Sequence, residues 1–282
     1  MEQVQLADDD IEVVILPEVG ARLHRLRVRG QDLLRTPADL SDHLRDPFRW
    51  GAYVMAPWCN RVEAGPVRAG SRLISPGANF PDGSAIHGQV YARPWQQLGD
   101  GKFLISAGGD GWPWEYEVGL RIQIANRSLW IEQTLTNLAV DPMPAGLGLH
   151  PWFRRPLLVA IHAEVVYPVN TASQPQPEPV SGSFDLRDMS EMAADLDATW
   201  ARLADPPVEL RWPTIGIGAT FRITAPTPHV VAASPGELDA IAIEPQTHAP
   251  QGLRRLLNGE PGGLAPLDPG RTLSLAVEMA FA

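Results

Sequence analysis

The sequence has 282 residues, of which 44% are hydrophobic, and a formal net charge of −10 with a pI near 5.1. A chain of this length can bury a large core, and all-β proteins of this size are often one domain. We therefore expect a single domain over residues 1–282. The acidic charge argues against nucleic acid or an anionic membrane surface as a partner.

Four further features of the sequence limit the compartment and the chemistry. Cys59 is the only cysteine, so no intrachain disulfide can form and nothing indicates an oxidising compartment. The amino terminus is acidic where a signal peptide is basic, and no apolar run approaches the roughly 18 residues of a membrane-spanning helix. We expect a soluble, cytoplasmic protein. Lys102 is the only lysine and lies in a glycine-rich turn, which argues against imine-forming catalysis.

Alternation of apolar and polar residues recurs along the chain and predicts β-strands with one face in a core. Residues 11–35 are expected to form an opening hairpin, and residues 66–85 a short hairpin and a loop. Two long strands joined by a turn at residues 126–128 are predicted between residues 115 and 137. A last strand is predicted over residues 273–281.

Two segments depart from this pattern. Residues 168–184 are rich in proline and serine and are expected to form a long connection. Residues 189–203 are the best helical candidate, although the segment is short. The pattern as a whole predicts an antiparallel all-β fold of two large sheets packed face to face, with few short helices.

Two polar residues stand beside apolar runs. His150 precedes Pro151, and because proline restricts the preceding residue to extended backbone, we expect His150 at the end of a strand. Glu244 ends an apolar run, where a carboxylate costs free energy unless it is paired or used. For each residue alone, a structural role in the core remains an alternative to a functional one.

Other polar candidates are less distinctive. His87 precedes Gly88, which also fits a turn histidine, and Arg61 follows Asn60, which also fits a structural salt bridge. His248 lies four residues after Glu244 and is a candidate to line the same pocket. The remaining histidines show no comparable setting: His24, His43, His162 and His229.

Four motifs, in this order, resemble those of the aldose 1-epimerase (galactose mutarotase-like) family. They are Asn60-Arg61 followed by Gly65, His87-Gly88 followed by Arg93-Pro94-Trp95, Met143-Pro144-Ala145-Gly146 leading to His150-Pro151-Trp152-Phe153, and Glu244-Pro245-Gln246-Thr247. Each motif alone is weak, but together they span most of the chain.

The resemblance implies a galactose mutarotase-like β-supersandwich with a sugar pocket on a concave face and with no cofactor or metal. It implies that Glu244 is the general base and His150 the general acid. It also implies that the sugar is bound by Asn60, Arg61 and His87. A sugar-binding aspartate of the family is matched by Asp197, although the histidine that usually follows it is absent here, and Asp195 is an alternative.

These groups suit the interconversion of sugar anomers. The reaction removes a proton from the C1 hydroxyl while the ring oxygen receives one, so a carboxylate and an imidazolium on opposite sides of the C1–O5 bond are the minimal pair. An aromatic ring such as that of Trp58 or Trp152 could stack on the apolar face of the sugar. The expected partner is a small-molecule sugar, bound by a monomer or homodimer.

Three alternatives remain open. An epimerase of a hexose 6-phosphate or another acidic sugar would need an anion site, which arginine could supply. A non-catalytic carbohydrate-binding module would not need a matched acid and base, so the presence of His150 and Glu244 argues against it. A metalloenzyme using His87, His150 and a carboxylate would be a facial triad, but these residues lack a short-range ligand motif.

Overall fold

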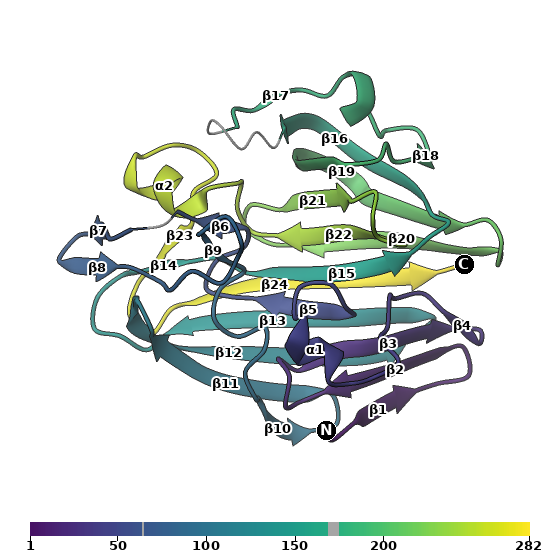
Figure 1. Ribbon diagram of the computed structural model, residues 1–282, viewed down its shortest axis with the longest axis horizontal. Helices are drawn as coiled ribbons and strands as arrows, with labels where there is room; N and C mark the ends of the chain where they lie inside the picture. The colour runs from purple at the N-terminus through teal and green to yellow at the C-terminus, as the bar shows by residue number, and fades with distance from the viewer. Residues whose placement is uncertain (64, 169–174) are drawn as a thin grey trace.

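The computed structural model describes residues 1–63, 65–168 and 175–282 (Figure 1). Within these ranges, strands dominate and 18 of them form one antiparallel sheet. The helices are short, namely α1 (Asp42–Arg45), α2 (Gly252–Leu257) and a 3₁₀ turn at Gly182–Phe184. This confirms the predicted all-β class with few short helices. No helix in the described ranges is long and apolar enough to cross a membrane.

The strand pairings arrange the sheet in two layers. The first layer consists of β1 (Val4–Ala7), β2 (Ile11–Leu16), β3 (Arg22–Val28), β5 (Ala52–Met55), β15 (Gly148–Arg154), β22 (Ala240–Gln246) and β21 (His229–Ser234). The second consists of β20 (Ile217–Thr224), β24 (Thr272–Phe281), β13 (Ser128–Asn137), β12 (Trp112–Ala125), β11 (Lys102–Gly109) and β10 (Gln96–Gly99).

One long strand joins the two layers. The first part of β19 (Leu196–Trp212) pairs with β21 and its last part pairs with β20, while β16 (Leu158–Pro168) pairs with both parts. The two layers are thus one continuous, curled sheet rather than the two separate sheets that the alternation suggested. Buried side chains from both layers form one contiguous cluster, which is the core.

Short strands complete the fold. The large sheet also contains β4 (Gln31–Asp32), β17 (Glu178–Pro179) and β18 (Ser190–Glu191). Three small sheets pair β6 (Arg61–Val62) with β9 (Ala85–Ile86), β7 (Val67–Ala69) with β8 (Arg72–Ile74), and β14 (Met143–Ala145) with β23 (Ala265–Leu267). The hairpins predicted over residues 11–35, 66–85 and 115–137 and the strand at 273–281 are confirmed by β2–β3, β7–β8, β12–β13 and β24.

Two sequence predictions need correction. Residues 189–203 are not helical, because they form β18 and the first part of β19, where Leu196 and Trp200 pair with Ser234 and Val230 of β21. Pairing with a distant strand outweighs a weak local preference. In the predicted connection 168–184, residues 169–174 lie outside the described ranges, and the remainder contains β17 and the 3₁₀ turn.

Candidate active site

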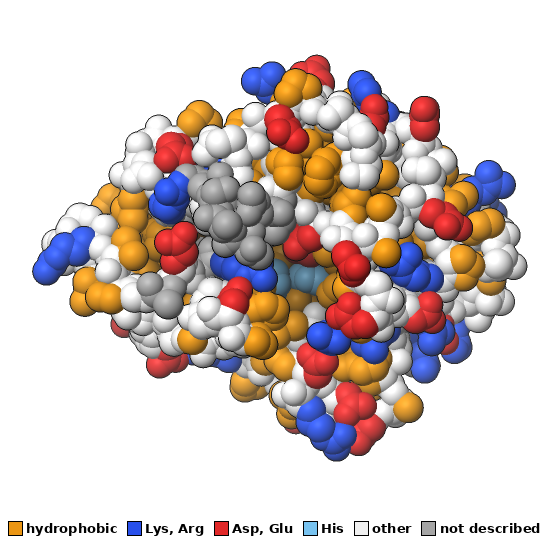
Figure 2. Space-filling model, turned by 45° about the horizontal axis from the view of Figure 1, so that its top comes forward, with side chains coloured by type: hydrophobic (Ala, Val, Ile, Leu, Met, Phe, Trp, Pro, Cys, Tyr) orange, Lys and Arg blue, Asp and Glu red, His pale blue; other side chains and the backbone are white. Residues whose placement is uncertain are grey.

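A cavity of about 190 Å³ opens on the face of the first layer that points away from the core (Figure 2). Adjacent residues on its strands face opposite ways, as β-structure requires. Val54, Leu149 and Ile243 belong to the core, whereas the residues before or after them line the cavity: Tyr53, His150 and Glu244. Figure 2 shows histidine surface at the bottom of this hollow, bordered by charged side chains.

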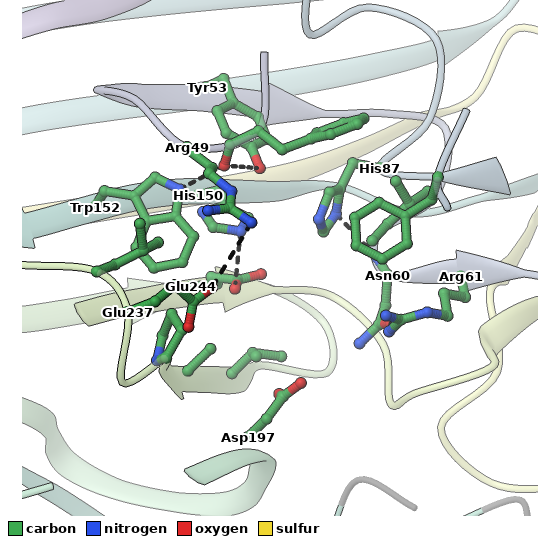
Figure 3. Close-up of a pocket in the computed structure, with 17 residues that line it drawn as sticks. Arg49, Tyr53, Asn60, Arg61, His87, His150, Trp152, Asp197, Glu237 and Glu244 are labelled. Carbon is green, nitrogen blue, oxygen red and sulfur yellow. Dashed lines mark hydrogen bonds and ion pairs between the residues drawn. The ribbon is translucent and has the colours of Figure 1, made fainter. Parts of the chain in front are cut away.

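All six residues predicted for the site line this cavity, although they come from segments far apart in the chain. They are Asn60, Arg61, His87, His150, Asp197 and Glu244. His150 and Glu244 lie on one side, and His87, Asn60 and Arg61 on the other (Figure 3). Asp195 does not line the cavity. Its carboxylate accepts a hydrogen bond from the Gly236 N–H at 2.8 Å.

His150 and Glu244 contact each other across two neighbouring strands. The register Gly148↔Gln246 and Trp152↔Ala242 sets His150 of β15 opposite Glu244 of β22. His150 Nε2 lies 3.1 Å from Glu244 Oε1, and each residue is only 4% exposed. The prediction that His150 ends a strand is therefore wrong, since it lies within β15.

Burial favours the uncharged form of both partners. It lowers the pKa of His150 to about 3 and raises the pKa of Glu244 well above its ordinary value. The negative charge of Asp197 raises the pKa of Glu244 further, and the positive charge of Arg61 opposes this. Burial therefore favours an imidazole and a carboxylic acid over an ion pair, and in that form the acid proton is donated to Nε2.

His87 is held by an unusual backbone. Asn60 and His87 have φ angles of 55° and 61°, in a region that non-glycine residues rarely adopt. The Asn60 N–H donates to His87 Nδ1 at 3.3 Å, so Nε2 carries the proton of the neutral ring. Burial lowers the pKa of His87 well below its ordinary value, which keeps the ring neutral. His87 is therefore a fixed hydrogen-bond donor beside His150, with ring centroids 5.0 Å apart.

Arg61 and Asp197 supply opposite charges to the cavity. The Arg61 guanidinium donates from Nε to Asp82 Oδ2 at 2.7 Å and lies over the Phe80 ring. Burial raises the pKa of Asp197, and Arg61 lowers it. The site can thus offer both donors and acceptors to the hydroxyl groups of a ligand.

Several lining residues were not predicted from the sequence. Tyr53 stacks on His150 with centroids 4.6 Å apart and an interplanar angle of 21°. Phe48, Arg49 and Glu237 also line the cavity. Only the pairing of β5 with β15, which no local pattern reveals, places this ring against the histidine.

Two other expectations are corrected here. Trp152 lines the cavity, but Trp58 packs against Trp112 in the core at 4.7 Å. His248 is buried outside the cavity lining, where its Nε2 accepts from the Cys59 N–H at 3.0 Å. It acts on the backbone just before Asn60 rather than on a ligand.

The described residues do not form a metal-binding arrangement of side chains. In the parts of the chain that the structure describes, no group of three or more His, Cys, Asp or Glu side chains is arranged to hold a metal ion. His150, one of the residues named in the metalloenzyme alternative, contacts Glu244 through Nε2.

The fold and the polar cavity define a mutarotase-like β-protein, and comparison with known proteins identifies the family. A family model described as aldose 1-epimerase matches residues 2–278, so the chain belongs to the aldose 1-epimerase family and is an isomerase of that class. A search of curated proteins gives no match.

Solved structures show the same fold at low sequence identity. A galactose mutarotase-like protein from Clostridium acetobutylicum has a TM-score of 0.83 at 18% identity, covering 99% of this chain and 94% of that one. An aldose epimerase homologue from C. elegans has a TM-score of 0.80 at 18% identity, covering 100% and 98%. A galactose 1-epimerase from Lactobacillus acidophilus has a TM-score of 0.79 at 17% identity, covering 99% and 93%.

Proposed function

We propose that this protein interconverts the α and β anomers of a neutral hexopyranose, with Glu244 and His150 as its acid–base pair. The observation that carries the proposal is the buried contact between these two residues at 3.1 Å, inside a cavity lined by hydrogen-bond donors and acceptors. Membership of the aldose 1-epimerase family supports the reaction class.

The pair already holds the proton that the reaction needs. The resting form, carboxylic acid and imidazole, contains as many protons as the reactive form, carboxylate and imidazolium, so no proton need be taken from solvent. Glu244 then removes the proton of the C1 hydroxyl, whose electrons form the C1 carbonyl as the C1–O5 bond breaks. O5 takes its proton from His150. Rotation about C1–C2 and the reverse steps close the ring with O1 on the other face.

Other residues would hold the sugar during these steps. The Nε2–H of His87 and the guanidinium of Arg61 are donors on the opposite side of the cavity. Asp197 and Glu237 are acceptors for hydroxyl groups, and Trp152 offers an apolar ring face. The cavity is smaller than the roughly 300–1,000 Å³ of pockets for drug-sized ligands, which favours a single sugar ring.

Charge favours a neutral sugar over a phosphorylated one. The carboxylates of Asp197 and Glu237 line the cavity beside the Glu244 carboxyl group. Both lining arginines already face carboxylates: Arg61 contacts Asp82 at 2.7 Å, and Arg49 contacts Asp46 at 3.6 Å and Glu237 at 3.7 Å. A phosphate would therefore compete for arginines that are already engaged.

Polarimetry of freshly dissolved α-D-glucose and α-D-galactose tests the proposal, in dilute buffer because buffer ions also catalyse mutarotation. We expect wild type to accelerate the change in rotation, and Glu244→Gln or His150→Gln to lower kcat by about 10²–10⁴-fold. The matched control is Glu209→Gln, which alters a second His–Glu contact, with His162 at 3.1 Å, away from the cavity.

Two results would reject this assignment. Full activity in Glu244→Gln would exclude the acid–base pair. Acceleration with glucose 6-phosphate but with neither neutral hexose would exclude the substrate class.

A further inference from the structure

Residues 47–50, here called the 47–50 wall, contribute Phe48 and Arg49 to the cavity lining. Side chains from other parts of the fold hydrogen-bond to the backbone of this segment at every residue. Each of its four backbone carbonyls accepts a hydrogen bond from a side chain elsewhere in the fold. The donors are Arg22 to Pro47 O at 2.7 Å, Trp152 to Phe48 O at 2.6 Å, Arg35 to Arg49 O at 2.6 Å and Arg22 to Trp50 O at 3.2 Å. Since Phe48 and Arg49 line the cavity, this segment positions part of the site.

Arg22 is the donor that binds both ends of the segment. It is the first residue of β3 and is fully buried. Its guanidinium also donates to Tyr91 O at 3.2 Å and lies 3.4 Å from His43 Nδ1. Because a guanidinium has no acceptor, this Nδ1 must accept, and the His43 Nε2–H then donates to His24 Nδ1 at 2.9 Å.

No carboxylate lies within ion-pair distance of Arg22 in the described ranges. Burying a cation whose carboxylate neighbour, Asp46, lies beyond ion-pair distance is expensive, so neighbouring neutral groups contribute to its stabilisation. One of them is the Tyr53 ring, whose centroid lies 4.6 Å from the guanidinium carbon. The same ring stacks on His150 at 4.6 Å. Arg22, Tyr53 and His150 are thus in consecutive contact.

We propose that Arg22 is a positioning residue that fixes the 47–50 wall and the Tyr53 ring on which His150 stacks. The planar, forked guanidinium is suited to this role, because it reaches the carbonyls of Pro47, Trp50 and Tyr91 at once. A lysine ammonium retains the charge but cannot bridge carbonyls that lie on different sides of the fork. The effect on catalysis rests on the function proposed above, whereas the effect on the wall does not.

A matched control exists in Arg255. It is buried too, lies over the Tyr167 ring at 5.0 Å and donates to the backbone carbonyls of Pro250 and Pro175. It differs from Arg22 in that it also pairs with Glu260 at 3.5 Å. It does not line the cavity. Arg255→Lys should therefore reproduce the general cost of altering a buried arginine without touching the 47–50 wall.

Limited trypsin digestion measures how readily residues 47–50 unfold locally, because cleavage after Arg49 requires this segment to open. We expect Arg22→Lys to be cleaved there at least about tenfold faster than Arg255→Lys under conditions in which both remain folded by circular dichroism. Arg22→Met, which lacks both charge and fork, should behave in the same way. Equal cleavage in Arg22→Lys and Arg255→Lys would overturn the proposal.

Polarimetry then tests the link to catalysis. A displacement of about 1 Å in a site can cost about 10²-fold in rate, so we expect Arg22→Lys to lower kcat by up to that factor while Arg255→Lys keeps kcat within about twofold. Faster cleavage with unchanged kcat would overturn the positioning role. If wild type itself shows no mutarotation, the proposed function fails, while the cleavage comparison still decides whether Arg22 fixes the wall.

Discussion

At the scale of single residues, burial and neighbouring charges set the protonation of the His150–Glu244 pair. In the proposed mechanism the pair acts only while it holds its shared proton, and burial together with Asp197 raises the pKa of Glu244, which favours retention of this proton. The rate should therefore fall at alkaline pH, with a midpoint above the ordinary pKa of 4.5 for a glutamate.

Asp197→Asn should move the alkaline fall in rate, here called the alkaline limb of the pH profile, to lower pH. Removing a neighbouring negative charge makes the Glu244 carboxylate easier to form, which lowers its pKa. The measurement is kcat/KM against pH, because it reports the free enzyme. Asp195→Asn is the control, since Asp195 lies outside the cavity lining. A limb that stays in place, or moves upward, would contradict the coupling.

Gly88 shows a second residue-scale constraint, because it approaches another segment too closely for a side chain. Its φ is +74°, and an added Cβ would lie 1.9 Å from Ala56 O. We expect Gly88→Ala to displace His87, lowering the free energy of unfolding by more than about 1 kcal/mol and reducing activity.

The control for Gly88→Ala is Gly30→Ala, which has a similar φ of +78° but open space around it. It should cost only the backbone strain of about 1 kcal/mol and retain activity. Urea denaturation and polarimetry of both variants separate the clash from the strain. Equal losses in the two variants would show that the approach to Ala56 is unimportant.

At the scale of elements, β13 shows how alternation separates core from surface. Ile131 is fully buried between Ile122 of β12 and Val277 of β24. Glu132, the next residue, faces solvent and pairs with Arg121 at 3.6 Å. The same strand thus offers a core position and a surface position in an almost identical backbone setting.

We expect Ile131→Ala to lower the free energy of unfolding by about 2–5 kcal/mol, because it removes buried methyl groups and leaves a cavity. Glu132→Ala should change it by less than about 1 kcal/mol, as is typical of exposed ion pairs. The midpoints of urea denaturation measure both. A smaller loss in Ile131→Ala than in Glu132→Ala would contradict the assigned faces of β13.

At the scale of the whole molecule, burial of many histidines couples folding to pH. Burial is the largest cause of a lowered pKa at six of them: His24, His43, His87, His150, His229 and His248. Below the ordinary pKa of 6.5, the unfolded chain protonates these rings while the folded protein keeps them neutral. The lowered pKa is about 4 for His24 and His248 and about 3 for His43 and His150. The unfolded state then binds more protons, so stability falls as pH falls.

We therefore expect a lower free energy of unfolding at pH 5 than at pH 7. Asp197 and Glu244 act in the opposite direction, because their raised pKa values give the folded state the extra proton above their ordinary pKa. Six histidines should outweigh two acids. Urea midpoints at the two pH values test this expectation, and an unchanged or higher midpoint at pH 5 would refute it.

Much of the fold was predictable from the sequence because strand alternation is local. Residues 115–137 and 273–281 alternate so regularly that no distant partner is needed to recognise them. The helix predicted over residues 189–203 was wrong because this segment forms strands by pairing with residues 230–234, which no local pattern reveals. Continuity of the two layers through β19 is likewise a matter of pairing.

The sequence by itself determined the all-β class and excluded a disulfide, because period-two alternation and cysteine content are local properties of the chain. The motif residues around Asn60, His87, His150 and Glu244 were predicted from their resemblance to a known family. Only the tertiary structure decided that Tyr53 lies beneath His150, that Arg22 supports it, and that Trp58 and His248 lie outside the cavity lining. The physical reason is that register and burial arise between distant strands. They set which face each side chain occupies and, through desolvation, which protons it holds.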